Sequence, residues 1–261
     1  YTKTLALKLN TIGLINIQFA IKNDIIYVIE VNPRASRTIP FISKVQNIPY
    51  AKYAAQIAVG KKIDDLNLEF KKTNLIAVKK PVFPFNKFPN QNVFLSPEMR
   101  STGEVIGFDY HLGSAYSKAE IGAGSILPKT GNIFISVHDN DKNEIVKIAR
   151  DFNEIGFDII ATSGTANLLK QNGIMCSSIF KVGEGRPNVV DSIKNNEIQF
   201  IINTPLGAQS RYDEYKIGKE AIKHKIAMTT TVAGAQAAFR AIRINNKLKY
   251  FSLQNIFKQK I

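Results

Sequence analysis

The chain has 261 residues, of which 44% are hydrophobic, and it carries a formal net charge of +14. Its lone Cys176 excludes an internal disulfide framework and fits a reducing cytosol, and no apolar run approaches the roughly 18 residues that suggest a membrane span. The lysines are scattered in pairs without an RNA-binding pattern of interleaved aromatic residues, so a cytoplasmic protein without nucleic-acid or membrane partners is expected.

The first predicted elements are two β-prone runs, residues 16–21 and 25–31, which are joined by a polar turn and together indicate a hairpin. Side chains alternate between the two faces of a strand. The odd-numbered positions are all apolar and are expected to form one buried face: Ile17, Phe19, Ile21, Ile25, Tyr27, Ile29 and Val31. Folding the hairpin at its turn places Gln18 opposite Val28, or within one residue pair of Glu30.

Three oxygen-bearing side chains share the even-numbered face of this hairpin: Gln18, Glu30 and Asn32. Magnesium prefers hard oxygen ligands and is usually held by one or two carboxylates together with substrate phosphates; manganese is a further candidate for such ligands. Arg34 and Arg37 follow at once, and their planar guanidinium groups match phosphate or carboxylate oxygens. The strand end therefore predicts a magnesium and phosphate site, while an exposed strand end with a few surface charges is the simpler alternative.

Less regular sequence follows the hairpin. Residues 51–59 predict a helix that ends at Gly60, a residue that commonly terminates helices. Residues 61–130 combine proline, glycine and aromatic residues without a sustained helical period. We therefore expect an irregular segment there, with a short helix at residues 114–121.

From residue 131 onward, predicted strands alternate with predicted helices. The expected strands are residues 133–137, 158–161, 179–182, 200–202 and 227–229. The expected helices are residues 142–155, 167–171, 189–194, 212–225 and 232–243. This alternation predicts a doubly wound α/β fold with a mostly parallel sheet, in which ligands bind at the carboxyl ends of the strands.

Polar residues gather at these predicted strand ends and at the first turns of the helices that follow them. They are Ser136, Lys142, Thr162, Thr165, Lys181, Asn203 and Thr204. The run at residues 162–165 follows a strand and opens a helix, where backbone N–H groups and the helix dipole can hold a phosphate. Alone, the run is equally well explained as an N-cap, but several such residues at one edge favour an anion pocket.

These motifs together resemble the large subunit of carbamoyl-phosphate synthases. The run Glu-Val-Asn-Pro-Arg-Ala-Ser-Arg-Thr at residues 30–38 resembles the end of the second ATP-grasp unit of that family. The runs at residues 85–89, 97–105 and 184–187 agree with it in order, and residues 131–261 resemble the closing methylglyoxal-synthase-like domain. Glu-x-Asn-x-Arg alone also fits biotin carboxylases, but its continuation and the downstream runs separate the two families.

The resemblance implies three segments. Residues 1–60 would be the C-terminal part of an ATP-grasp domain, residues 61–130 a linking segment that packs on it, and residues 131–261 an allosteric domain. The chain would then be a C-terminal piece of a larger subunit and inactive alone. Its partners would be the rest of the large subunit and a glutamine amidotransferase small subunit.

The activity implied by the resemblance is that of an ATP-dependent ligase. The enzyme would make carbamoyl phosphate from bicarbonate, ammonia released from glutamine and two ATP, for pyrimidine and arginine biosynthesis. Gln18, Glu30 and Asn32 would hold magnesium on the nucleotide phosphates. Arg34 and Arg37 would neutralise charge on the transferring phosphoryl group.

The family's effector motif, carried over residue by residue, implies that the polar strand-end residues bind a nucleotide, with UMP, UTP and IMP as candidates. Pro205 stands where the bacterial pattern often has a third hydroxyl residue. Many bacterial members also bind ornithine through a glutamate and a tyrosine, at positions that Lys80 and Met228 occupy here. Ornithine is therefore not expected to activate.

Two alternatives to a ligase remain open at this point. The chain could be a stand-alone nucleotide-binding regulatory module without catalysis. It could also be a free-standing relative of methylglyoxal synthase that acts as a lyase. A lyase would need a carboxylate beside the phosphate pocket, for which Asp139 and Asp141 are the candidates.

Overall fold

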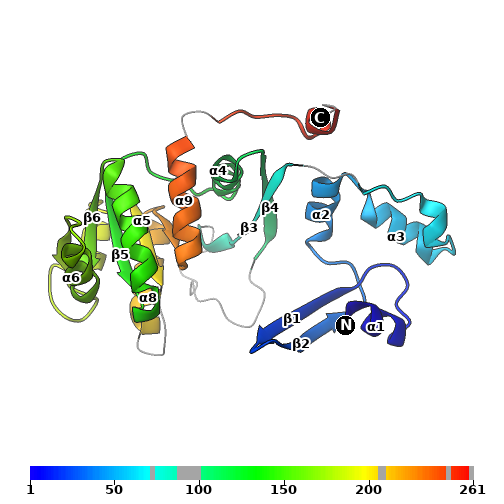
Figure 1. Ribbon diagram of the computed structural model, residues 1–261, viewed down its shortest axis with the longest axis horizontal. Helices are drawn as coiled ribbons and strands as arrows, with labels where there is room; N and C mark the ends of the chain where they lie inside the picture. Colours follow the sequence, from blue (N-terminus) through cyan, green and yellow to red (C-terminus); the bar gives the residue numbers. More distant parts are fainter. Residues whose placement is uncertain (71–73, 87–100, 205–209, 245–247, 259–261) are drawn as a thin grey trace. The chain divides into compact units, whose positions relative to one another are not determined.

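The computed structural model divides into two compact units, Tyr1–Asn74 together with Tyr250–Ile261, and Leu75–Lys249 (Figure 1). The residues it describes are 1–70, 74–86, 101–204, 210–244 and 248–258. The predicted division into segments at residues 60 and 130 stays a prediction. Among the helices described, none is long and apolar enough to cross a membrane.

The first unit contains the predicted hairpin, formed by β1 (Asn16–Lys22) and β2 (Ile25–Asn32). Asn23 and Asp24 form its two-residue loop with φ of +51° and +60°, left-handed values that both central residues of a type I′ turn require. The unit's remaining helical elements are α1 (Thr2–Lys8), α2 (Ile39–Gln46), α3 (Tyr50–Ala58), a 3₁₀ turn at Ile63–Leu66 and α10 (Leu253–Lys258).

The register of the hairpin corrects the predicted apolar face. Gln18 pairs with Glu30 but Phe19 pairs with Val28, so a β-bulge leaves Ile29 as an extra residue in β2. Paired residues point to the same side of the sheet, and the bulge moves the face of every β2 residue that precedes it. The residues of the apolar face are therefore Ile17, Phe19, Ile21, Ile26, Val28 and Val31.

The prediction that this face is buried is also wrong for the described residues. Ile21 is 72% exposed and Val28 is 46% exposed. The reason is that β1 and β2 form a two-stranded sheet, whose faces receive little cover from the rest of the described chain. The placement of Gln18, Glu30 and Asn32 on one face is retained, because all three lie on the far side of the bulge from the turn.

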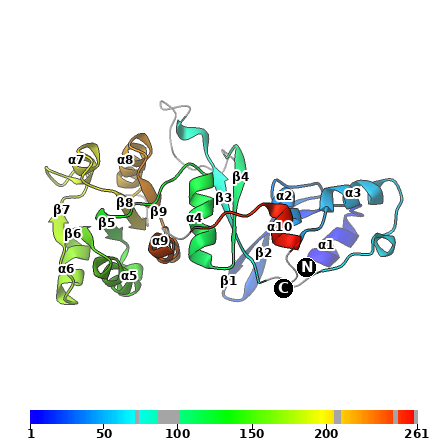
Figure 2. The same ribbon diagram turned by 90° about the horizontal axis from the view of Figure 1, so that it is seen from above.

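The second unit is built on a five-stranded parallel sheet with the order β7-β6-β5-β8-β9 (Figure 2). Its strands are β5 (Gly131–Val137), β6 (Phe157–Thr162), β7 (Ser177–Ile179), β8 (Phe200–Thr204) and β9 (Ala227–Thr229). Its helices are α5 (Lys142–Glu154), α6 (Ser163–Gln171), α7 (Val189–Lys194), α8 (Ser210–Lys223) and α9 (Val232–Ile244). The alternation of strands and helices confirms the predicted α/β class.

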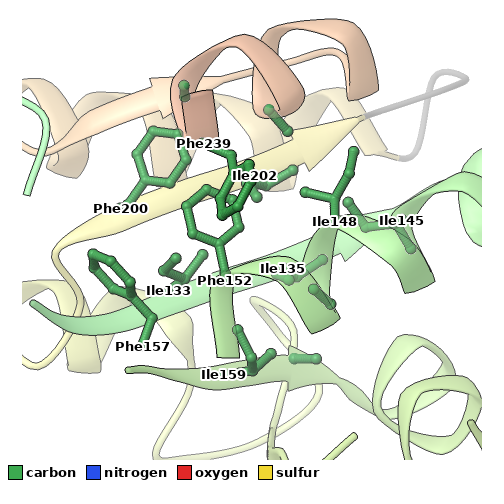
Figure 3. Packing of buried hydrophobic residues seen from close by; sticks show 14 of the residues in the cluster. Ile133, Ile135, Ile145, Ile148, Phe152, Phe157, Ile159, Phe200, Ile202 and Phe239 are labelled. Carbon is green, nitrogen blue, oxygen red and sulfur yellow. The ribbon is translucent and has the colours of Figure 1, made fainter. Parts of the chain in front are cut away.

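The sheet is covered on both faces. Helices α5, α6 and α9 lie on one face, while α7 and α8 lie on the other (Figure 2). Phe152 of α5 is fully buried, with its ring centroid 5.7 Å from that of Phe157, 6.1 Å from that of Phe200 and 5.2 Å from that of Phe239 (Figure 3). This aromatic cluster joins α5 and α9 to β6 and β8, the strands on either side of β5.

The prediction of an irregular segment over residues 61–130 is wrong for Ile76–Val82 and Gly103–Asp109, whereas the short helix expected at residues 114–121 is confirmed at Leu112–Gly122. β3 (Ile76–Val82) and β4 (Gly103–Asp109) form an antiparallel pair, and α4 (Leu112–Gly122) packs against it. Pro81 concealed the strand, because proline lacks the N–H that an inner strand needs, yet a two-stranded ribbon tolerates it at an edge. Residues 87–100, which carry part of the quoted family motifs, lie outside the described residues.

Helix α4 connects this ribbon to the sheet. A Cβ on Gly107 of β4 would lie 1.9 Å from the carbonyl oxygen of Ala115, so only glycine permits this approach. On the opposite side, a Cβ on Gly113 would lie 2.5 Å from the carbonyl oxygen of Arg240 in α9. The ribbon, α4 and α9 therefore pack as successive layers of one unit (Figure 2).

Candidate functional site

A cavity of about 770 Å³ lies at the carboxyl ends of β5, β6 and β8, the position at which doubly wound sheets bind ligands. Five of the seven residues predicted for the anion pocket line it. They are Ser136, Thr162, Lys181, Asn203 and Thr204. The parallel register explains this convergence, because Ser136 lies beside Asn203 in the neighbouring strand.

Local hydrogen bonds fix the hydroxyl groups of this pocket. Thr162 Oγ1 donates to Ser136 Oγ at 3.4 Å, and the backbone N–H of His138 donates to Thr204 Oγ1 at 3.1 Å. Asn203 is only 6% exposed and lines the cavity. A side-chain amide can donate to a ligand through its nitrogen and accept through its oxygen.

The first turn of α6 borders the same cavity. Thr162 occupies the N-cap position, yet no side chain of the described structure caps the helix, so its first N–H groups are not satisfied in that way. Lys142 Nζ lies 3.7 Å from the place that a Cβ on Gly164 would take. Helix N-termini with free N–H groups and a nearby cation favour anions.

Two predicted pocket residues do not line the cavity. Thr165 is 2% exposed and belongs to the buried side of α6. Lys142 lies beside the cavity, where its Nζ is 2.6 Å from Oδ1 of the lining residue Asp139. The hydrogen bond and charge of Lys142 hold the pKa of Asp139 below its usual range. Lys142 thus neutralises a carboxylate at the rim of the cavity.

Lys181 lies in a loop and not at a strand end. The predicted strand at residues 179–182 is wrong, because β7 stops at Ile179 and Phe180 makes only an isolated bridge to Asn188. Glu184 closes the loop, since its Oε2 accepts a hydrogen bond of 3.0 Å from the backbone N–H of Lys181. The loop directs both Lys181 and Glu184 to the cavity lining.

Sequence reasoning missed Tyr212 and Asp213, which open α8 and line the cavity. The rule that found Thr162, a polar residue in the first turn after a strand, also applies to Asp213, but residues 205–209 separate β8 from α8. Burial raises the pKa of the Asp213 carboxyl, the Lys181 charge opposes this, and Glu184 adds to it.

The hairpin of the first unit carries the other predicted site. Gln18 is directly opposite Glu30, and Asn32 Nδ2 donates to Glu30 Oε1 at 3.0 Å. Because the Asn32 amide uses its nitrogen in this bond, its oxygen stays available, and the three side chains together offer hard oxygen ligands that fit magnesium. Arg34 and Arg37 are exposed, and Arg34 Nη1 donates to the carbonyl oxygen of Ala35 at 3.0 Å.

No group of three or more histidine, cysteine, aspartate or glutamate residues that could hold a metal occurs in the described residues. A cation at the hairpin would consequently depend on the amide oxygens of Gln18 and Asn32 besides Glu30, and on ligand phosphates. Magnesium accepts such an incomplete protein set, because it commonly keeps waters and substrate phosphates in its coordination shell.

Comparison with known proteins agrees with this arrangement. Residues 144–230 match the MGS-like domain family, and residues 2–66 match the family described as carbamoyl-phosphate synthase L chain, ATP binding domain. These matches define an α/β protein in which part of an ATP-binding domain precedes an MGS-like domain.

Individual relatives identify the protein family more specifically than the two domain matches do. The carbamoyl phosphate synthase large chain of Archaeoglobus fulgidus is 52% identical over 244 residues, which are 93% of this chain and 23% of that protein. The large chain of Acidobacterium capsulatum is 46% identical over 258 residues, 95% of this chain and 23% of that protein. The large chain, C-terminal section, of Aquifex aeolicus is 43% identical over 265 residues, covering 95% of this chain and 49% of that protein.

The chain belongs to the carbamoyl-phosphate synthase large-chain family, as its motifs predicted. It spans about a quarter of the length of the first two of these relatives, 23% in each case.

Proposed function

We propose that the full-length protein is an ATP-dependent ligase that makes carbamoyl phosphate, and that this chain supplies part of its carbamate-phosphorylating site and its regulatory domain. The support is the similarity to relatives that carry this name, together with the oxygen-rich hairpin. The proposal includes a cytoplasmic enzyme of pyrimidine and arginine biosynthesis. Its partners would be the rest of the large subunit and a glutamine amidotransferase small subunit.

Within that enzyme, Gln18, Glu30 and Asn32 would hold magnesium against the phosphates of ATP. When bound, the metal would offset negative charge on the nucleotide. Arg34 and Arg37 would orient the transferring phosphoryl group and stabilise its charge, since phosphoryl transfer depends chiefly on positioning and electrostatics. No nucleophilic side chain is required for this step.

The regulatory proposal is carried by the cavity at the carboxyl edge of the five-stranded sheet. It combines Lys181, the side chain of Asn203, and a helix N-terminus without a side-chain cap among the described residues. These features suit a phosphate group. An effector bound there would control activity if it binds one conformational state more tightly than another.

The charges of the cavity favour a monophosphate over a triphosphate. Among its described lining residues, Lys181 is the cation, whereas Asp139, Glu184 and Asp213 are carboxylic acids. A triphosphate would bring several more negative charges to a lining that already contains three acidic groups. UMP and IMP are therefore better candidates for the effector than UTP.

Lys181→Ala should weaken the binding of UMP to the full-length protein by about 1.5–3 kcal/mol, as expected for the loss of a hydrogen bond to a charged group. Isothermal titration calorimetry measures the change. Lys147→Ala is the matched control, because Lys147 is an exposed lysine of α5 that does not line the cavity. Equal UMP affinity in Lys181→Ala and the unaltered protein would place the phosphate elsewhere.

Ornithine should not activate the full-length protein. Lys80 Nζ forms an ion pair with Glu120, whose carboxylate is nearly buried at 4% residue exposure, so an ammonium group already occupies this acidic partner. An ammonium group of ornithine at this position would be repelled by the positive charge of Lys80. Carbamoyl-phosphate synthesis at subsaturating ATP, with and without millimolar ornithine, measures this, and clear activation would contradict it.

A further inference from the structure

The ribbon of β3 and β4 is braced by α4, which is tied to both of its strands. Lys118 Nζ of α4 lies 2.8 Å from Oδ2 of Asp109 and 2.9 Å from the carbonyl oxygen of Phe108, both at the end of β4. Lys80 of β3 forms an ion pair with Glu120 of α4. Polar contacts that are satisfied and shielded from water make a structure rigid. The ribbon and α4 therefore form one stiff body.

The turn that follows β3 connects this body to α8. β3 ends at Val82, and the 3₁₀ turn after it, Pro84–Asn86, packs against α8. The partly buried rings of Phe83 and Phe85 stack on each other here, with their centroids 5.1 Å apart and their planes 5° apart. Stacked rings add an attractive contact beyond the area they bury, so they hold the turn in one shape.

Both ends of β3 lead to a proposed site. α8 contributes Tyr212, Asp213 and Ile217 to the lining of the cavity. At its other end, β3 begins at Ile76, two residues after Asn74, where the N-terminal part of the first unit ends. One strand thus connects a helix of the cavity, through packing, with the unit that contains the proposed magnesium hairpin, through the chain itself.

The charges of the cavity give a reason for α8 to move when an anion binds. Burial raises the pKa of the Asp213 carboxyl, the charge of Lys181 lowers it, and the charge of Glu184 raises it further. A phosphate bound to Lys181 would neutralise the lysine and leave the two carboxylates to repel each other and the phosphate. Such repulsion is stronger in a partly desolvated site than in water. The first turn of α8 would then shift, and a helix shifts as a rigid element.

We propose that the turn at Pro84–Asn86 is a relay, which passes the position of α8 to β3 and through β3 to the ATP-binding unit. The relay rests on the proposed function, because it needs a nucleotide in the cavity and a second ligand, ATP, at the first unit. Phe85 is then a positioning residue. It does not line the cavity, yet it sets how strongly the binding of one ligand affects the binding of the other.

The test is calorimetric titration of the full-length protein with UMP and with a non-hydrolysable ATP analogue, each alone and in the presence of the other. In the unaltered protein, UMP should change the affinity for the analogue by about 5- to 150-fold, the usual range for coupled sites. Phe85→Ala should bring this factor close to one, while UMP alone binds as tightly as before. Because coupling is reciprocal, the analogue should lose its effect on UMP affinity to the same extent.

Phe85→Leu keeps an apolar side chain but removes the stacked ring, so it should lower the factor by less, and it serves if Phe85→Ala fails to fold. Ile126→Ala is the control, because Ile126 is 74% exposed in the same unit and belongs neither to the turn, nor to α8, nor to the cavity lining. This variant should keep the factor of the unaltered protein.

The possible contrary results are distinct. An unchanged factor in both Phe85 variants would overturn the relay while the nucleotide site stands. UMP that binds the unaltered protein without changing its affinity for the ATP analogue would also overturn the relay. Failure of UMP to bind the unaltered protein would instead remove the proposed nucleotide site, and the relay with it.

Discussion

Glu30→Gln in the full-length protein should stop carbamate phosphorylation and lower carbamoyl-phosphate synthesis by about 10²–10³-fold or more, the loss typical of one removed charge-stabilising contact. Glu30 faces Gln18 across the hairpin and accepts a 3.0 Å hydrogen bond from Asn32, so it is the one carboxylate of the proposed magnesium set. Glutamine keeps the size of the side chain but removes its negative charge. Product formation from bicarbonate, glutamine and ATP measures the loss.

Bicarbonate-dependent ATP cleavage should survive in this variant, because we propose that it occurs at another ATP-grasp unit of the enzyme. Asp24→Asn is the matched control in the same hairpin. Asp24 has a φ of +60°, a left-handed conformation that asparagine also tolerates, so this change removes a charge without straining the turn. Unchanged carbamoyl-phosphate synthesis in Glu30→Gln would exclude Glu30 as a metal ligand.

Phe152→Ala should destabilise the sheet unit by about 3–5 kcal/mol, the usual cost of removing a large core aromatic side chain. Phe152 is fully buried and its ring contacts those of Phe157, Phe200 and Phe239, so the cavity left behind would lie between two helices and the sheet (Figure 3). Urea unfolding of the chain, followed by circular dichroism, measures the change in free energy.

The control for this stability prediction is Phe70→Ala, because Phe70 is 67% exposed. Substitutions at such surface positions usually change stability by less than about 0.5 kcal/mol. A loss below about 1 kcal/mol for Phe152→Ala would show that the aromatic cluster does not hold α5 on the sheet.

The sheet unit was predictable because its strands and helices each have a strong local signal. Residues 133–137 form a short run that is apolar except for Ser136, and α5 has buried apolar residues at Ile145, Ile148 and Phe152, with helical spacing. The ribbon of β3 and β4 was not predictable in the same way. Its stability depends on α4, which packs closely against Gly107. This is a tertiary contact, so it cannot be predicted from the local sequence pattern.

The hairpin shows which features the alternation of side chains along a strand can predict and which it cannot. Alternation correctly grouped Gln18, Glu30 and Asn32, since these residues lie on one side of the bulge. Alternation failed for Tyr27, because a single extra residue at Ile29 reverses the faces of everything between it and the turn. Bulges arise from strand pairing, so a sequence read one strand at a time does not reveal them.

The residues of the candidate nucleotide site could be predicted where they lie at the ends of predicted strands. Ser136, Thr162 and Asn203 end adjacent strands, and the carboxyl ends of parallel strands necessarily meet at one edge. Asp213 was missed because it follows its strand only after an intervening stretch of chain. Its approach to the cavity depends on how α8 packs against the sheet, which is a property of the assembled fold.

The most direct test of a regulatory nucleotide site in this family member is a crystal structure of the full-length protein with UMP. We predict a phosphate between Lys181 and the first turn of α6, within hydrogen-bond distance of the Asn203 amide. A structure with UMP bound elsewhere and this cavity filled only by water would contradict it.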